Sequence, residues 1–80
     1  MKLSDVSVHQ KVTIKTINCD EELKKRFYSF GIRRNSTVII ENISFAKNTI
    51  GLNIDGTLVA LRMEEAKTIE VALEKTEEEK

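Results

Sequence analysis

The stretch TIGLNIDGTLVALR, residues 49–62, decides the fold of this chain because it predicts an antiparallel hairpin. Asp55 and Gly56 suit a two-residue type I′ turn, in which both central residues need a positive φ angle. Pairing outward from this turn sets residue 54 against 57, 52 against 59 and 50 against 61. One face of the hairpin is then apolar and consists of Ile50, Leu52, Ile54, Val59 and Leu61. A slip of one residue would turn this face to water, so the register should be well defined.

A second stretch, CDEELKKRFYSFGI at residues 19–32, predicts one short helix over residues 21–30. Asp20 can cap its N-terminus, and the two glutamates that follow complement the helix dipole. Gly31 can adopt the left-handed conformation just beyond the C-terminus, and Ile32 can then pack back on Phe27. The helix should bury a narrow apolar stripe of Leu23, Phe27 and Phe30.

Three further stretches are typical of short strands because they are rich in β-branched and alternating apolar residues. They are KVTIKTIN at residues 11–18, TVIIENISF at residues 37–45 and TIEVAL at residues 68–73. MEEAK at residues 63–67 predicts a single helical turn. The chain is therefore expected to be mainly β, a small antiparallel barrel of about five strands. One helix follows the first strand, and a short helical turn precedes the last.

Size and composition limit the classes of protein to which the chain can belong. Its 80 residues suit one domain, and 13 basic residues balance 13 acidic ones, which argues against a general nucleic-acid binder. No apolar run approaches the ~20 residues of a membrane span, and no signal segment opens the chain. Together with the single cysteine, these features favour the cytoplasm. We expect a folded domain at residues 1–73 and a charged, disordered tail, EKTEEEK, at residues 74–80.

No group of residues has the spacing of a catalytic site, so an enzyme is not expected. His9 is the only histidine, which excludes His-rich metal sites, and its polar neighbours indicate a solvated loop. Cys19 precedes the helix N-terminus, where the dipole can lower the pKa of a thiol. A small residue outside the helix is the simpler interpretation of Cys19. The three glycines are scattered, so no phosphate-binding loop is present.

Basic residues surround the outer face of the predicted helix, namely Lys24, Lys25, Arg26, Arg33 and Arg34. From the residues alone, two interpretations remain open. The cations can form a solvated face that complements the negative end of the helix dipole. They can also form an electropositive rim around Tyr28, which lies off the apolar stripe, for a partner with an acidic surface.

The order of these pieces resembles the ferrous iron transport protein A (FeoA) family. The matching stretches are LSD at residues 3–5, the helix region at residues 20–32, LVALR at residues 58–62 and EEA at residues 64–66. The resemblance covers residues 1–71. It implies a small cytoplasmic protein with an SH3-like β-barrel that acts in bacterial ferrous iron uptake on FeoB, a membrane permease with a cytosolic G-protein domain. The family is also described as metal-associated, although no agreed metal-site motif carries over.

The sequence departs from the family pattern at its turns. Val8 and His9 stand where a Pro-Gly turn is expected, and residues 47–49 (KNT) replace a Gly-Asp-Pro turn. Cys19 replaces a glycine before the helix, and Phe27 and Phe30 replace leucines within it. These changes should alter local loops more than the core.

The leading hypothesis is a non-enzymatic module that docks on the cytosolic G-protein region of a FeoB-type permease and modulates it. Its expected contact residues are Lys24, Lys25, Arg26, Tyr28, Arg33 and Arg34. The residues expected to hold the surrounding structure are Leu23, Phe27, Phe30, Gly31, Ile32, Asp55 and Gly56.

Two alternatives come from other functional classes. One is a stand-alone metal-responsive domain that binds Fe(II) or another divalent transition metal weakly through His9, Cys19 and carboxylates. Few soft or imidazole ligands are available for it. The other is an RNA-binding SH3-like barrel, which the near-neutral charge and the single aromatic residue near the cations disfavour.

Overall fold

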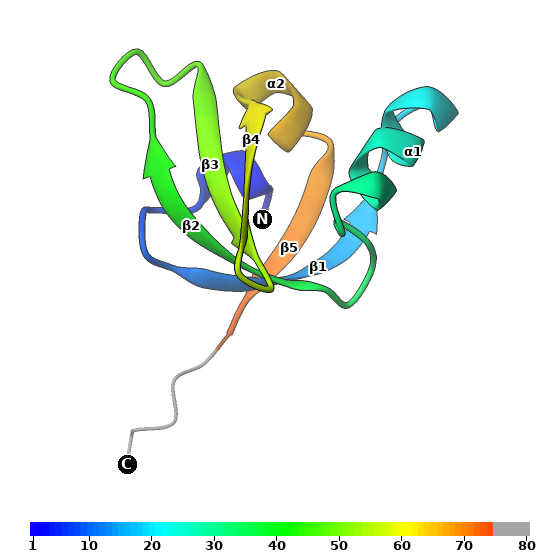
Figure 1. Cartoon of the computed structure of the whole chain (residues 1–80), viewed down its shortest axis with the longest axis horizontal. Coiled ribbons are helices and arrows are strands. Elements are labelled where there is room, and N and C mark those ends of the chain that lie inside the picture. Colours follow the sequence, from blue (N-terminus) through cyan, green and yellow to red (C-terminus); the bar gives the residue numbers. More distant parts are fainter. Residues whose placement is uncertain (75–80) are drawn as a thin grey trace.

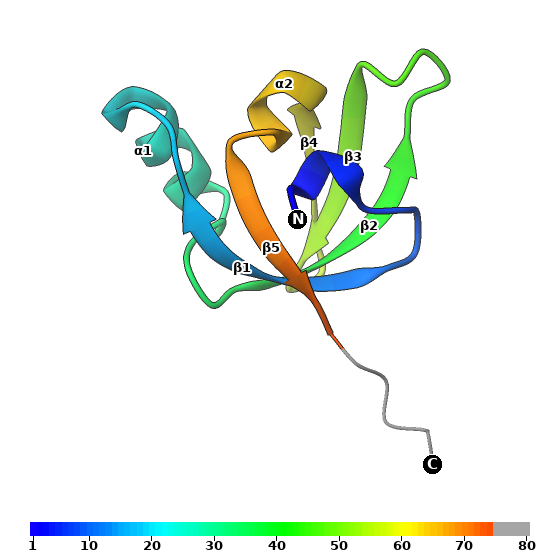
Figure 2. The ribbon, with the colours of Figure 1, turned by 180° about the vertical axis from the view of Figure 1, so that it is seen from behind.

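The computed structural model describes residues 1–74 and confirms the predicted order of strands and helices. In chain order the elements are a 3₁₀ turn η1 (Leu3–Asp5), β1 (Lys11–Ile17), α1 (Glu21–Ser29), β2 (Thr37–Ile43), β3 (Thr49–Ile54), β4 (Thr57–Arg62), α2 (Met63–Ala66) and β5 (Ile69–Leu73). Figures 1 and 2 show the sheet curled around one core, with α1 to one side of it. Of the predicted tail, only Glu74 is among the described residues, and its N–H donates to the Lys11 carbonyl at 3.0 Å.

The five strands form one antiparallel sheet in the order β4-β3-β2-β1-β5. The register shifts between Ile14 and Thr16 of β1 and between Ile40 and Asn42 of β2. Such bulges increase the local twist and bend a strand, which allows a sheet this small to wrap around its core. The curved sheet with its inserted helices confirms the predicted SH3-like fold.

The hairpin forms with the predicted register, pairing Ile54 with Thr57 and Leu52 with Val59. Asp55 and Gly56 have φ angles of +52° and +87°, as a type I′ turn requires. The side-chain oxygen of Asn53 also accepts a hydrogen bond from the Gly56 N–H at 2.8 Å. The turn therefore holds the register through local interactions.

Helix α1 begins and ends through the predicted caps. The Asp20 carboxylate accepts a hydrogen bond from the Leu23 N–H at 2.9 Å. At the other end, Gly31 has a φ of +91°, and the Ile32 N–H donates to the Phe27 carbonyl at 2.8 Å. This bond, with that from the Gly31 N–H to the Tyr28 carbonyl at 3.0 Å, makes a Schellman motif.

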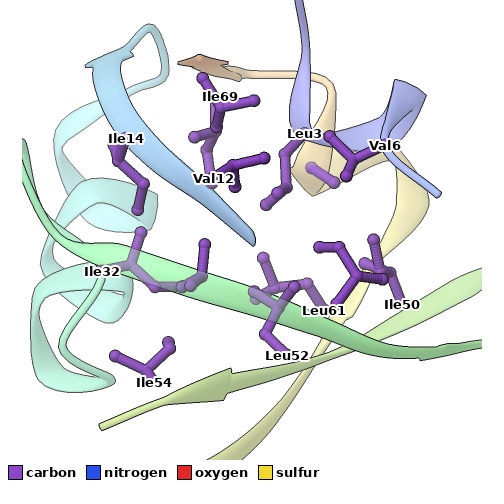
Figure 3. Close-up of a cluster of buried hydrophobic side chains, with 14 of the residues drawn as sticks. Leu3, Val6, Val12, Ile14, Ile32, Ile50, Leu52, Ile54, Leu61 and Ile69 are labelled. Atoms are coloured by element: carbon purple, nitrogen blue, oxygen red, sulfur yellow. The ribbon is translucent and has the colours of Figure 1, made fainter. Parts of the chain in front are cut away.

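The core lies between the curved sheet and the helices, as Figure 3 shows. Its fully buried side chains come from nearly every element and include Leu3, Val12, Ile14, Phe27, Ile32, Val38, Ile40, Ile50, Leu52, Leu61, Ala66 and Ile69. Of the predicted helical stripe, Phe27 is fully buried, whereas Leu23 and Phe30 are half-buried at the edge of the core. Among residues 1–74 the core buries no polar or charged residue.

The second predicted strand is shorter than expected. It ends at Ile43 because the Ser44 hydroxyl accepts hydrogen bonds from the N–H groups of Asn48 and Thr49, at 2.9 and 3.1 Å. The resulting turn leaves the side chain of Phe45 fully exposed. Residues 44–48 therefore form a loop rather than the end of a strand.

Candidate partner-binding surface

The predicted contact residues come from α1 and from the segment that follows its C-terminal cap. Tyr28 follows the buried Phe27 in α1, and helical periodicity turns the Tyr28 side chain away from the core. Tyr28 is 46% exposed. Lys25, Arg33 and Arg34 are also exposed, and Lys24 is half-buried. Arg33 and Arg34 come directly after the residues of the C-terminal cap, so they lie next to the end of α1.

Arg26 has a partner within the chain. Its Nη1 donates to Oε2 of Glu65 in α2 at 2.9 Å, and its guanidinium lies 5.8 Å from the centroid of the Phe30 ring. The pKa of Glu65 is lowered, first by the hydrogen bond from the Arg62 backbone N–H and then by Arg26. Arg26 therefore links α1 to α2 and also belongs to the exposed basic set.

A groove of about 620 Å³ lies between the C-terminal end of α1 and strand β4, and we call it the α1–β4 groove. Its lining includes Tyr28, Phe30 and Arg33 on one side, and Leu58, Val59 and Ala60 on the other. Leu58 is 70% exposed, so it presents apolar surface at the edge of this groove. The groove therefore combines apolar surface with two charged side chains of opposite sign at its wall, Arg33 and Asp55.

A second groove, of about 370 Å³, continues along β4 toward α2, and we call it the α2-side groove. It shares Ala60 with the α1–β4 groove and is also lined by Arg26, Arg62 and Glu65. The two grooves together follow β4 from its beginning to its end.

The structure thus divides the six predicted contact residues into two groups. Tyr28 and Arg33 line the α1–β4 groove, and Arg26 lines the α2-side groove. Lys24, Lys25 and Arg34 line neither of these grooves. Leu58 and Ala60 were missed as candidates, although their alternation with the inward-facing Val59 and Leu61 was visible in the sequence.

The family match agrees with this fold. Residues 1–73 match the FeoA domain family. The chain belongs to the FeoA domain family. It is 40% identical over 73 residues to a candidate Fe(2+) transport protein A of Campylobacter jejuni, covering 91% of this chain and 99% of that protein.

Solved FeoA structures share the same architecture. The solution structure of the FeoA protein from Chlorobium tepidum superposes with a TM-score of 0.89 at 22% identity, covering 99% of this chain and 75% of that one. A FeoA-like protein from Clostridium acetobutylicum gives a TM-score of 0.83 at 26% identity, covering 100% and 95%. The FeoA family consists of transport accessory proteins rather than enzymes, and this chain is therefore not an enzyme. Within residues 1–74, no helix is both long and apolar enough to span a membrane.

One turn at which the sequence departs from the expected FeoA pattern has a strained backbone. His9, where the resemblance implies a glycine, adopts a φ of +74°, a conformation that glycine reaches without strain. Lys47, in the other altered turn, has a φ of +60°. The exposed His9 side chain confirms the predicted loop position, and its N–H donates to the Ile40 carbonyl at 2.7 Å.

The two weak metal candidates do not lie together. His9 precedes β1 and Cys19 follows it, and seven strand residues separate them by about 20 Å along the chain. Among residues 1–74, no group of three or more His, Cys, Asp or Glu side chains is arranged to hold a metal ion. The described residues therefore do not fit a resident metal site made from His9 and Cys19.

The environment of Cys19 is opposite to that of a reactive thiol. Its pKa is raised, first by burial and then by the neighbouring Asp20 carboxylate. The pKa is therefore shifted in the direction opposite to the lowering that a position before the helix N-terminus suggested, with burial as the first cause. The half-buried side chain packs against the core, as the simpler interpretation predicted.

Proposed function

We propose that this FeoA-family protein is a cytoplasmic accessory protein of ferrous iron uptake. It docks on the cytosolic G-protein region of a FeoB-type permease and modulates that permease. The similar Campylobacter jejuni protein is described as an Fe(2+) transport protein A, which supports the iron context. The observation that carries the docking proposal is the partly exposed Tyr28 next to Arg33 at the α1–β4 groove.

This pair has the chemistry of an interface anchor. Tyrosine and arginine dominate the binding energy of many protein interfaces, because a rigid ring or a planar guanidinium buries much area and still forms hydrogen bonds. The Arg33 side chain donates to the Tyr28 carbonyl at 3.4 Å, so both residues are placed by the same helix end. The anchor is therefore held in position before a partner arrives.

The surrounding charge favours an acidic partner. Among residues 1–74, the ion pairs within 4.0 Å are those from the N-terminal amine to Glu70 and from Arg26 to Glu65. Lys24, Lys25, Arg33 and Arg34 consequently have no carboxylate partner among these residues. A group of unpaired cations increases the association rate with an acidic surface, and salt weakens this effect.

RNA receives less support from the same surface. Tyr28 is the one strongly exposed aromatic side chain beside the cations, since Phe45 lies in the loop between β2 and β3. Single-stranded RNA is normally held by several stacked bases. A single exposed ring at the groove is better suited to a protein partner.

The test is a calorimetric titration of the full chain with the purified cytosolic region of the permease. The variant Lys25→Glu/Arg33→Glu/Arg34→Glu should bind at least about tenfold more weakly at low salt, with a smaller dependence on salt than the wild type. Lys47→Glu is a matched control, since it reverses an exposed charge in the loop between β2 and β3. Equal binding by the triple variant and Lys47→Glu would exclude this surface, and no binding by the wild type would exclude the partner.

A further inference from the structure

The two edge strands of the sheet differ in whether another segment of the chain pairs with them. At the β5 edge, the Val71 N–H donates to the Met1 carbonyl at 2.8 Å, and Lys2 forms an isolated bridge with Glu70. The other edge is β4, drawn in yellow in Figure 1, and its one neighbour in the sheet is β3. Within residues 1–74, no chain segment covers the β4 edge as the N-terminus covers β5.

The hairpin register shows which backbone groups of β4 are free. In a two-residue hairpin, the pair beside the turn exchanges both ladder hydrogen bonds, and every second pair after it does the same. Thr57, Val59 and Leu61 therefore point their N–H and C=O groups toward β3. The backbone groups of Leu58 and Ala60 point away from β3, and they form no hydrogen bond with other described residues.

This edge also lacks the features that normally block strand addition. Proteins protect exposed edges with proline, bulges, charged side chains or very short strands. The chain contains no proline, and the β3–β4 ladder runs without a register shift over six residues. Along the free edge, Leu58 and Ala60 are exposed and uncharged, and Arg62 is the first charged residue.

We propose that β4 accepts an extended segment of the partner as an additional strand, held along the α1–β4 groove. The backbone groups of Leu58 and Ala60 would pair with this segment, and Leu58 and Tyr28 would pack against its apolar side chains. An acidic residue of the segment would meet Arg33 at the groove wall. The inference rests on the proposed function only for the identity of the partner.

Charge favours such a segment over a second copy of this chain. Antiparallel pairing of two β4 strands would place Arg62 of the second copy at the Leu58 end of the first. Arg33 and Asp55 both line the groove at that end, so Arg62 of a second copy would meet one charge of each sign and gain no net attraction there. A partner segment with acidic residues would instead meet Arg33, near Lys25 and Arg34, two cations that have no carboxylate partner among residues 1–74.

The test uses two edge variants of the full chain that should leave the fold intact. Ala60→Pro removes an outward-pointing N–H without breaking a β3–β4 hydrogen bond, and proline is tolerated on edge strands. Leu58→Lys places a charge on a side chain that is already 70% exposed. Phe45→Lys is the matched control, because Phe45 is also an exposed apolar residue but lies in the loop between β2 and β3. Circular dichroism and thermal unfolding verify that each variant is folded.

The first probe is the cytosolic region of the permease. Both edge variants should bind it about tenfold more weakly or worse, because removing a hydrogen bond or an apolar side chain from the interface weakens association. Phe45→Lys should bind as the wild type does. In hydrogen exchange, the Leu58 and Ala60 amides of the wild type should become protected on binding. Full binding by folded Ala60→Pro and Leu58→Lys, or no protection of these amides, overturns the inference and leaves the proposed function standing.

The second probe is a displayed library of random peptides selected against the wild-type chain. It separates the inference from the proposed function. Selected peptides that alternate apolar and acidic residues and fail to bind Ala60→Pro support strand addition, even if the permease region does not bind. An absence of such peptides, together with no permease binding, overturns both proposals. If the β4 amides became more protected from hydrogen exchange as the concentration of this protein was raised without a partner, a second copy would be the occupant and the inference would be overturned.

Discussion

Arg26 and Glu65 lie 39 residues apart in the sequence and form an ion pair with 2.9 Å between Nη1 and Oε2. This pair connects α1 to α2, and both residues line the α2-side groove with the C-terminal half of β4. The Arg26 side chain is 54% exposed, so the pair adds little to stability and is best understood as a positioning contact for α1. Because α1 forms one wall of the grooves along β4, this contact helps to set their width.

The first prediction concerns the pH dependence of stability at Glu65. Its pKa in the folded protein lies below the ordinary value of 4.5, because the ionised carboxylate accepts hydrogen bonds from the Arg62 N–H and from Arg26. The ionised form therefore stabilises the fold above pH 4.5, and this contribution is lost as the pH falls through the lower folded pKa. Urea unfolding should show that Glu65→Gln loses less stability than the wild type between about pH 7 and about pH 3. Glu64→Gln changes an exposed neighbour and should lose as much stability as the wild type over this pH range. If Glu65→Gln lost stability in parallel with the wild type, Glu65 would not be the group responsible for the pH dependence.

The second prediction compares two glycines that both have positive φ angles. A Cβ at Gly31 would lie 3.3 Å from Cγ2 of Ile54, whereas a Cβ at Gly56 would meet nothing within 4 Å. Gly56→Ala should cost about 1 kcal/mol of unfolding free energy through its backbone conformation alone. Gly31→Ala should cost more, about 2 kcal/mol, since the side chain also crowds Ile54. If both variants lost the same unfolding free energy in chemical denaturation, the Ile54 side chain would move away from the added Cβ at no energetic cost.

The third prediction is that a glycine at position 9 stabilises the protein. His9 has a φ of +74°, and its side chain is exposed, so replacement removes backbone strain and no buried contact. The relief exceeds the entropy that glycine adds to the unfolded chain, and His9→Gly should raise the unfolding free energy by about 0.5 kcal/mol. Val8→Gly is the control, because Val8 is not among the residues with positive φ, and it should lower stability. A loss of stability in His9→Gly would mean that the histidine ring makes a stabilising contact in solution.

The fourth prediction concerns the reactivity of the single thiol. Since burial and then Asp20 raise the pKa of Cys19, alkylation by iodoacetamide near neutral pH should be slower than that of a free thiol. Asp20→Asn keeps a side chain that can cap α1 but removes the charge. It should accelerate the reaction only partly, because desolvation is the larger cause. Alkylation faster than that of a free thiol would show that the helix dipole controls this cysteine after all.

How well a feature could be predicted from the sequence depends on how far apart in the chain the interacting residues lie. The turn at Asp55 and Gly56 and the caps at Asp20 and Gly31 depend on residues within a few positions, so their chemistry is visible in the sequence. The exposure of Tyr28 follows in the same way from helical periodicity. The pKa of Cys19 could not be predicted, because its first cause is burial, which depends on how distant parts of the chain pack around the thiol.

The amino-acid sequence alone thus determined the hairpin register, the helix and its caps, the mainly β class and the family resemblance. Tertiary structure decided that β4 is an open sheet edge and that α1 lies beside it to form a groove. These features depend on which strands pair across the sheet and on contacts such as Arg26 with Glu65, between residues far apart in the chain. Local propensity contains no information about an unpaired edge, because the alternation of Leu58 and Ala60 with inward-facing residues is the same in an edge strand and a central one.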